Sequence, residues 1–113
     1  MATMMLFSFG FRHGKPTQFE ADHIIDIRPW FGRNPYHDKK LRKLRGTDKA
    51  VQDDILKTPD FERKYTDLKN YVANLSGIVA IGCTGGHHRS VYLVERMGKD
   101  LECEFFHRDY DKP

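Results

Sequence analysis

The sequence contains few cysteines and no long run of apolar residues. Its two cysteines, Cys83 and Cys103, cannot form the disulfide framework of a small secreted domain, and they fit a reducing compartment. The apolar runs reach only a few residues, whereas a helix that crosses a bilayer needs about 20. The N-terminus lacks the basic segment and the long apolar stretch of a signal peptide. We therefore expect a cytoplasmic protein that has no membrane partner.

The motifs of nucleotide-hydrolysing loops and of metal sites are absent as well. A Walker loop needs Lys before Ser or Thr, but Gly86 is followed by two histidines and then by Arg89 and Ser90. No Cys-x2-Cys or His-x3-His pair occurs, and the adjacent His87 and His88 would point about 100° apart on a helix. The sequence thus predicts neither a metal site nor a cofactor.

The residues that are present fit one globular domain of ordinary composition. The length of 113 residues allows a single core, and 39% apolar with 31% charged residues is typical of such domains. We therefore expect residues 1–113 to form one domain. The net charge of +3 permits a polyanionic partner without requiring one.

Basic residues are concentrated between residues 28 and 49, where they outnumber the acidic ones. Trp30, Phe31 and Tyr36 lie in the same segment, and basic residues mixed with aromatic ones suit a nucleic-acid backbone with stacked bases. A solvated charged loop would have the same composition, so both interpretations stay open. The candidates for RNA binding are Arg33, Lys39, Lys40, Lys43 and Arg45, together with His107 and Arg108 near the end of the chain.

Apolar runs, helical spacing and turn residues predict a mostly parallel α/β sheet of about four strands with flanking helices. Residues 61–75 carry apolar side chains at helical spacing, which we expect to face the sheet. Thr58 would cap this helix, and Pro59 would occupy its first turn. Residues 30–46 should form a long loop, and long loops in compact domains are usually functional. Strands are expected at residues 4–9, 24–27, 78–81 and 102–106, and further helices at 47–57 and 90–97.

Residues 78–90 carry the most specific local pattern, in which a predicted strand leads through a glycine-rich loop into a predicted helix. Glycine lets backbone N–H groups converge on one point, and the N-terminus of the helix adds its positive dipole end. Two histidines and an arginine supply further donors and charge. This combination predicts an anion site that suits phosphate. The predicted phosphate-binding residues are Thr84, Gly85, Gly86, His87, His88, Arg89 and Ser90.

Polar clusters also follow the other predicted strands. Residues 10–13 follow the first strand, and residues 107–109 follow the last. Ligands of parallel α/β sheets bind beyond the carboxyl ends of the strands, so we expect these clusters and the glycine-rich loop around one pocket. Further candidates for this pocket are Asp26 and Arg28 after the second strand, and His37 and Arg42 in the long loop.

An enzymatic alternative rests on Cys83. Cys83-x5-Arg89-Ser90 has the spacing of the cysteine-phosphatase loop, in which a thiolate attacks phosphorus and an arginine holds the phosphoryl oxygens. A position between a strand and a helix N-terminus favours a reactive thiolate, and Asp26 could serve as the general acid. Gly82, however, stands where such enzymes usually carry His. A non-catalytic binding module is the preferred interpretation, and a cysteine-dependent phosphatase or phosphotransferase is the alternative.

Gly-Cys-Thr-Gly-Gly-His-His-Arg-Ser-Val, at residues 82–91, resembles the signature of the C-terminal domain of the RapZ family of RNase adapter proteins. Weaker matches to that family follow in order along nearly the whole chain. They are residues 8–14, Asp26-x-Arg28 before Asn34-Pro35, Leu41-Arg42 before Gly46-x-Asp48, and His107-Arg108.

The resemblance implies a domain that binds a phosphorylated small molecule, which is an amino-sugar phosphate in the best-understood members. It also implies contact with small regulatory RNA and presentation of that RNA to a ribonuclease, and it leaves self-association of this chain open. By position, residues 84–86 and 88–90 carry over as the phosphate loop, and Asp26 and Arg28 as pocket neighbours.

The sequence departs from the family in three respects. Members carry an N-terminal kinase-like domain with a Walker loop, which this chain lacks, so we expect a stand-alone copy of the C-terminal domain. Arg12 and His13 replace the family's Lys and Tyr, and Arg45 stands where Thr is usual. We therefore expect this chain to retain the phosphate site of the family, whereas the ligand that it binds can differ from the family's ligand.

Overall fold

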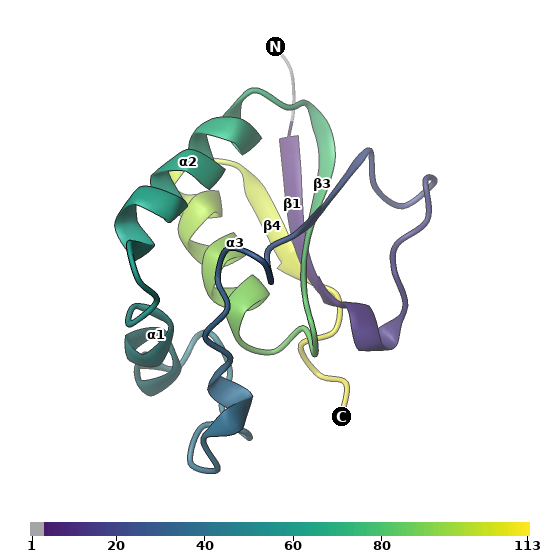
Figure 1. Cartoon of the computed structure of the whole chain (residues 1–113). Helices are drawn as coiled ribbons and strands as arrows, with labels where there is room; N and C mark the ends of the chain where they lie inside the picture. The colour runs from purple at the N-terminus through teal and green to yellow at the C-terminus, as the bar shows by residue number, and fades with distance from the viewer. Residues whose placement is uncertain (1–3) are drawn as a thin grey trace.

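A four-stranded sheet in the order β2-β3-β1-β4 forms the centre of the protein (Figure 1). The computed structural model describes residues 4–113. The strands are β1 (Met4–Gly10), β2 (His23–Asp26), β3 (Gly77–Cys83) and β4 (Glu104–His107). The helices of this part of the chain are α1 (Lys49–Ile55), α2 (Phe61–Ala73) and α3 (Arg89–Asp100), with short 3-10 helices η1 (Phe11–His13) and η2 (Pro35–His37). The predicted α/β fold and the predicted order of strands and helices are confirmed.

All strand pairs in the sheet are parallel, which places the carboxyl ends of the strands at one edge. β1 and β3 pair along their whole length and end together at Gly10 and Cys83. β2 ends beside them, where Asp26 pairs with Gly82. β4 lies on the other side of β1 and ends at His107. The polar clusters that follow the strands therefore leave the sheet at the same edge, the lower one in Figure 1.

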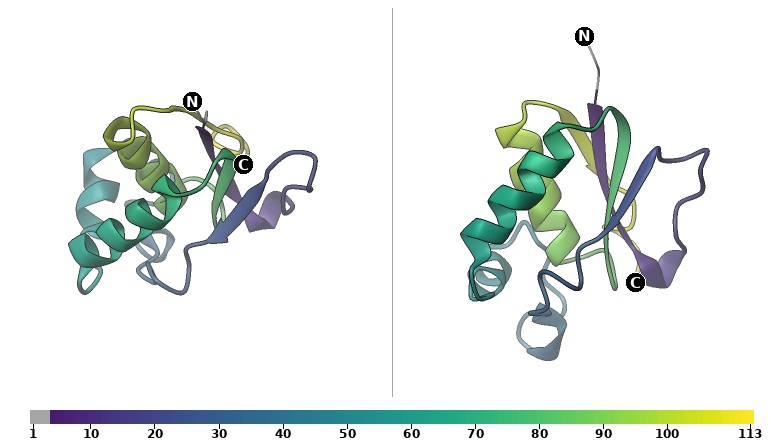
Figure 2. Two further views of the ribbon diagram at one scale, coloured as in Figure 1. Left: turned by 90° about the horizontal axis from the view of Figure 1, so that it is seen from above. Right: turned by 45° about the horizontal axis from the view of Figure 1, so that its top comes forward.

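The two faces of the sheet are covered differently (Figure 2). α2 and α3 lie on one face, and their buried side chains join those of β1, β2 and β3 in the main core. On the other face, Phe11 and Ala21, from the segment between β1 and β2, pack with Phe7 and Phe9. β1 and β3 are buried over most of their length, as strands of a parallel sheet covered on both faces must be.

The apolar stripe of α2 faces the core as predicted. Phe61, Tyr65, Leu68 and Val72 are all buried, and Leu75, just beyond the helix, packs against the same cluster. Each fully buried side chain of this size contributes about 1.5–3 kcal/mol to stability. The helix is therefore held mainly by its packing on α3 and the sheet.

The predicted start of α2 is wrong. The helix begins at Phe61, and its N-cap is Asp60, which adopts a left-handed conformation with φ of 58°. Thr58 instead takes part in a preceding turn, where its carbonyl accepts a hydrogen bond from the N–H of Phe61 (3.1 Å). A Thr hydroxyl can cap a helix only from the residue that directly precedes the first turn. The left-handed turn thus displaces the helix start beyond Thr58 and Pro59.

The last strand also begins later than predicted, at Glu104. Glu102 has a positive φ of 53°, and the N–H of Cys103 bonds to the carbonyl of Gly98 (3.0 Å). These two residues therefore terminate α3. The predicted long loop contains η2, which Asn34 caps by accepting a hydrogen bond from the N–H of Tyr36 (3.1 Å). No helix within residues 4–113 has the length and apolar character that crossing a membrane requires.

Candidate anion-binding site

The loop of residues 84–88 joins β3 to α3 at the carboxyl edge of the sheet. Across the described residues 4–113, the N–H groups of Gly85, Gly86 and His88 donate to no protein acceptor. His88 is the N-cap residue of α3 and makes no capping hydrogen bond through its side chain. Unpaired N–H groups in a loop and at a helix N-terminus form a concentration of positive partial charge. The backbone here suits an anion.

Two glycines allow this loop to lie directly on the end of β1. A Cβ atom on Gly10 would stand 2.3 Å from the carbonyl carbon of Gly85, which is closer than real contacts allow. Gly86 has a φ of 77°, a conformation that glycine adopts without strain. Gly86 packs against Gly10 and Asp109, so its role in the structure is to shape the loop.

Asp109 fixes the end of β1 through a hydrogen bond to Gly10. Its buried carboxylate accepts hydrogen bonds from the N–H of Gly10 (2.7 Å) and from the guanidinium of Arg108, and it pairs with Lys112 (2.7 Å). Burial by itself would raise the pKa of Asp109, but these hydrogen bonds outweigh it and hold the pKa well below the ordinary value. The carboxylate is therefore ionised at neutral pH and fixes the position of Gly10.

Arg89 is a buried cation that has no acidic partner among residues 4–113. The residue is only 4% exposed. Its guanidinium donates to the carbonyl of Phe31 (2.8 Å) and contacts the hydroxyl of Thr84 (3.5 Å), and its Nε has no partner within the described chain. Burial lowers the pKa of Arg89, yet a guanidinium stays protonated in proteins. Because an unpaired buried charge is strongly unfavourable, this site is poised for an anion.

A cavity of about 150 Å³ opens beside Arg89. This volume is several times the roughly 30 Å³ that one water occupies in the liquid, so a phosphate group fits. No acidic side chain is among the residues that line it. They are Arg12, Asn34, Tyr36, Cys83, Thr84, Gly85, His87, His88 and Arg89.

The two histidines of the loop are tied to neighbouring segments. Nε2 of His88 donates to the carbonyl of Leu44 (2.9 Å), and Nε2 of His87 donates to the carbonyl of Lys112 (2.6 Å). Burial lowers the pKa of both histidines below the ordinary value. They therefore favour the neutral form at pH 7, so the main positive charge of the loop comes from Arg89.

Three residues of this cavity were not among the predicted site residues. Arg12 lies in η1, two residues after Gly10, and Tyr36 lies in η2 directly after Pro35. Asn34 precedes the same proline. Their participation depends on how η1 and η2 approach the loop of residues 84–88. The polar cluster that follows β1 was the sequence signal for Arg12, and the Asn-Pro turn was the signal for Asn34 and Tyr36.

Asp26 and Arg28 lie beside the cavity rather than in it. The guanidinium of Arg28 donates two hydrogen bonds to the carboxylate of Asp26 (2.9 and 2.8 Å). It also lies over the ring of Phe11, 4.3 Å from the ring centroid. The hydrogen bond from Arg28 is the main cause that holds the pKa of Asp26 below its ordinary value. Asp26 is therefore ionised at neutral pH, and its negative charge is already neutralised by Arg28.

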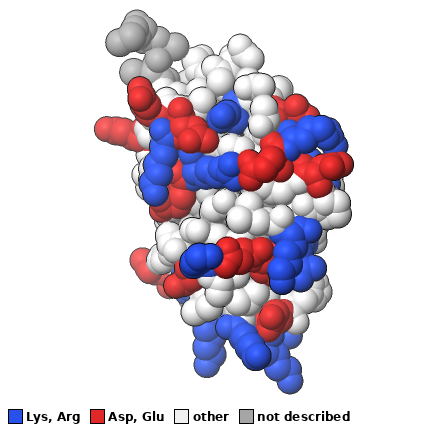
Figure 3. Space-filling view, turned by 90° about the vertical axis from the view of Figure 1, so that its left-hand side faces the viewer, with Lys and Arg blue, Asp and Glu red and all other residues white. Residues whose placement is uncertain are grey.

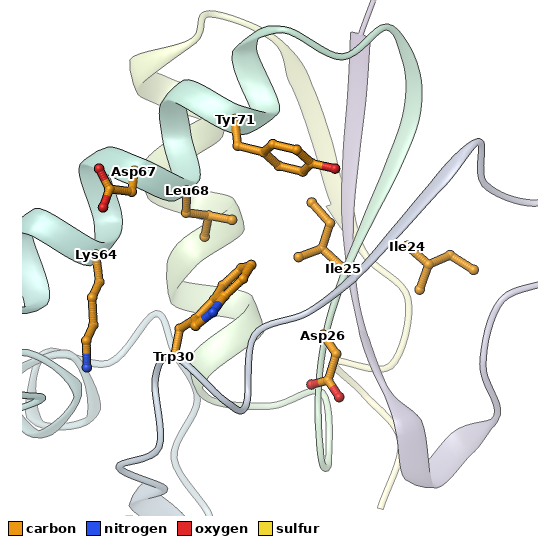
Figure 4. Close-up of a pocket in the computed structure, with 8 residues that line it drawn as sticks. All are labelled: Ile24, Ile25, Asp26, Trp30, Lys64, Asp67, Leu68 and Tyr71. Carbon is orange, nitrogen blue, oxygen red and sulfur yellow. The ribbon is translucent and has the colours of Figure 1, made fainter.

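Asp26 borders a larger groove of about 600 Å³ between β2 and α2 (Figure 4). Figure 4 shows the rings of Trp30 and Tyr71 pointing into this groove between Leu68 and Ile25. Among residues 4–113, Lys64 is the one cationic residue that lines it. The groove is larger than the cavity at Arg89, but its mainly apolar lining does not fit an anion.

The remaining predicted residues lie in two other cavities and near the end of the chain. Arg42, Lys43 and Arg45 line a neighbouring cavity of about 280 Å³. His37, Arg33, Lys39 and Lys40 line a shallow surface depression, where Arg33 pairs with Asp54 (2.9 Å).

His107 and Arg108 make contacts inside the protein. His107 bonds to the hydroxyl of Ser8 (2.7 Å) and to Glu95 (2.9 Å), and Arg108 bonds to Asp109 and to the carbonyl of Gly14. These contacts give both residues a role in joining β4 and the C-terminal segment to the rest of the fold.

Cys83 is the last residue of β3, and Ser90 lies in the first turn of α3. The thiol of Cys83 is 2% exposed and stands 3.1 Å from the hydroxyl of Ser90. Cys83 lines the cavity, whereas Ser90 is fully buried and also contacts the carbonyl of Phe9 (3.4 Å). Ser90 therefore contacts a residue that lines the cavity but does not line it itself.

Comparison with known proteins places these features in a family. The family model for the RapZ C-terminal domain matches residues 2–111. A nucleotide-binding protein of Pseudomonas putida is 41% identical over 105 residues, which cover 84% of this chain and 36% of that protein. A nucleotide-binding protein of Pediococcus pentosaceus is 40% identical over an alignment of length 121, which covers 93% of this chain and 39% of that protein.

A nucleotide-binding protein of Macrococcus caseolyticus is 41% identical over an alignment of length 114, which covers 92% of this chain and 36% of that protein. The chain thus spans little more than a third of the length of these relatives. The match covers both the glycine-rich loop and the strand ends that surround it. The chain belongs to the RapZ C-terminal domain family.

Proposed function

We propose that the protein binds the phosphate group of a phosphorylated metabolite, an amino-sugar phosphate or a nucleotide, in the cavity beside Arg89. The observation that carries this proposal is the buried guanidinium of Arg89. In the part of the chain that the structure describes, it has no acidic partner and shares its cavity with a loop whose N–H groups are unpaired. The relatives named as nucleotide-binding proteins support a phosphorylated ligand. In this proposal the protein is a cytoplasmic, non-catalytic adapter that also contacts small RNA and presents it to a ribonuclease.

Replacing Arg89 tests the phosphate site. We expect Arg89→Met to weaken the binding of phosphate, glucosamine 6-phosphate and AMP by about tenfold or more, because each charge-assisted hydrogen bond contributes roughly 1.5–3 kcal/mol. Calorimetry measures the affinities, and a thermal-shift screen identifies which ligand stabilises the native protein. Arg63→Met is the matched control, since Arg63 is an exposed, ion-paired residue of α2. Equal affinities in the two variants would refute the site.

A second candidate function is favoured by the contact between Cys83 and Ser90. Cysteine phosphatases need a hydroxyl near the attacking sulfur and an arginine at the phosphoryl oxygens, and Cys83 shares its cavity with Arg89. The thiolate would displace an alcohol from phosphorus, and the departing oxygen would need a proton. Asp26 is poorly suited to supply this proton, because its pairing with Arg28 keeps it ionised.

Cys83→Ser distinguishes the two functions. Turnover of a generic phosphoester by the unaltered protein that disappears in this variant would establish the enzyme. Absence of turnover in both proteins, together with retained phosphate affinity, would support the binding module. Arg89→Met should abolish phosphoester turnover as well if the enzyme is real.

A further inference from the structure

The arginines without an acidic partner are gathered in one region of the protein. Most arginines of residues 4–113 form ion pairs, which involve Arg28, Arg33, Arg63, Arg96 and Arg108. Within the same residues, no ion pair includes Arg12, Arg42, Arg45 or Arg89. All four of these arginines line one or both of two adjoining cavities.

The second cavity is a basic extension of the one beside Arg89. The two cavities share Arg12, Tyr36 and His87, so they adjoin. The second has a volume of about 280 Å³ and no acidic side chain in its lining. Its lining residues are Arg12, Tyr36, Arg42, Lys43, Arg45, His87 and Pro113.

Backbone carbonyls hold the guanidinium groups of this second cavity in place. Nε of Arg42 donates to the carbonyl of Tyr36 (2.6 Å), and the guanidinium stacks on the Tyr36 ring at 4.9 Å. Nε of Arg45 donates to the carbonyl of Tyr110 (2.9 Å), and Arg12 donates to that of Pro113 (2.7 Å). These bonds orient the side chains. The carbonyls of Tyr36 and Tyr110 carry no net charge, so they leave the positive charges of Arg42 and Arg45 uncompensated. A preorganised guanidinium loses little entropy when an anion binds.

We infer that the natural ligand carries at least two phosphoryl groups, as a small-molecule diphosphate or a nucleoside polyphosphate does. One phosphoryl group occupies the cavity beside Arg89, and the next reaches the basic cavity of Arg12, Arg42 and Arg45. The first placement rests on the function proposed above, whereas the second rests on the unpaired arginines alone. Several like charges held around one cavity repel each other, and a single phosphate beside Arg89 leaves that repulsion in place.

Inorganic phosphates of increasing length test this inference. Calorimetry at constant ionic strength compares orthophosphate, pyrophosphate and tripolyphosphate as ligands of the native chain. We expect tripolyphosphate to bind about tenfold or more tightly than orthophosphate, because its outer groups gain charge-assisted hydrogen bonds from the second cavity. Arg42→Gln/Arg45→Gln should remove most of this gain, which is measured as the ratio of the tripolyphosphate affinity to the orthophosphate affinity of the same variant.

Two controls separate a specific subsite from general charge attraction. Lys39→Gln/Lys40→Gln removes the same charge from exposed residues outside both cavities, and it should preserve the gain. Arg42→Gln alone is the milder variant if loss of the bond from Arg45 to Tyr110 unfolds the protein, and it should remove part of the gain. A gain that survives in Arg42→Gln/Arg45→Gln, or that disappears equally in the lysine variant, would overturn the inference.

The remaining outcomes distinguish this inference from the function proposed above. If Arg89→Met leaves the orthophosphate affinity unchanged, the site proposed above is refuted. In that case, a gain in tripolyphosphate affinity that depends on Arg42 and Arg45 would still support the second cavity. A short oligouridylate is the last probe. If Arg42 and Arg45 strengthen oligouridylate binding but not tripolyphosphate binding, the occupant is a nucleic-acid backbone and the small-molecule inference is refuted.

Discussion

At the scale of single residues, charge is placed to serve two different purposes. Asp109 is fully buried and its carboxylate is satisfied by Gly10, Arg108 and Lys112, so its charge stabilises the fold. Arg89 is almost as deeply buried, but the described residues give it no acidic partner. A buried ion that is paired supports structure, whereas one that is left unpaired within its own chain indicates a ligand of opposite charge.

Removing the charge of Asp109 should destabilise the protein in a pH-dependent way. The pKa of Asp109 is lower in the folded than in the unfolded chain, so the stabilisation is complete above the unfolded value of about 3.9 and is lost as the pH falls below it. We expect Asp109→Asn to lower the free energy of unfolding by about 3 kcal/mol at pH 7. The difference from the unaltered protein should shrink below about pH 4, which urea unfolding at pH 7, 4 and 2.5 would measure.

The neighbouring acid provides the control for this prediction. Asp111 is exposed, so Asp111→Asn should change stability only slightly at any of these pH values. A deficit in Asp109→Asn that stays constant from pH 7 to pH 2.5 would show that the ionised form of Asp109 is not the stabilising species.

At the scale of secondary-structure elements, the sequence predicted the parallel sheet and the order of strands and helices along the chain, because local patterns determine them. Buried parallel strands require apolar runs, and the stripe from Phe61 to Val72 has the spacing of one helix face. The start of α2 was missed because it depends on the left-handed conformation of Asp60, which no residue type at that position demands. Tyr36 was not predicted, and Arg12 was expected near the pocket only as part of the cluster of residues 10–13, because η1 and η2 meet the glycine-rich loop only through long-range packing.

The contact between β1 and the glycine-rich loop gives a prediction at this scale. A Cβ on Gly10 would meet backbone atoms of Gly85 and Gly86 at 2.3–2.6 Å, and a backbone cannot move away as a flexible side chain can. We expect Gly10→Ala to lower the free energy of unfolding by about 1–3 kcal/mol and to displace the loop. Phosphate affinity should fall with it, as measured by calorimetry on protein that thermal unfolding shows to be folded.

Gly32→Ala is the matched control for Gly10→Ala. The nearest atom to a Cβ on Gly32 is the carbonyl oxygen of Arg28 at 4.0 Å, so the added methyl group has room. This variant should keep both stability and phosphate affinity. If Gly10→Ala binds phosphate as well as Gly32→Ala does, the apposition of loop and strand does not position the anion site.

At the scale of the whole molecule, charge is distributed unevenly although the net charge is only +3. On the face shown in Figure 3, acidic and basic side chains lie next to each other over much of the surface, and basic ones gather at its lower end. The segment of residues 35–45 projects at this end of the molecule in Figure 1. Lys39, Lys40, Arg42 and Lys43 of this segment are exposed. Such a projection can follow a nucleic-acid backbone while the anion cavity lies next to it.

The projecting basic segment should make RNA binding steeply dependent on salt. Each phosphate that the protein neutralises on single-stranded RNA contributes about −0.7 to the slope of log K against log salt concentration. We expect replacement of Lys39, Lys40, Arg42 and Lys43 by Gln to flatten this slope by about two units or more, measured by fluorescence anisotropy with a labelled oligoribonucleotide. Replacing four lysines outside this segment by Gln, at positions 57, 64, 69 and 99, removes the same charge and should preserve most of the slope. Equal slopes in the two variants would mean that net charge, and not the projecting segment, attracts the RNA.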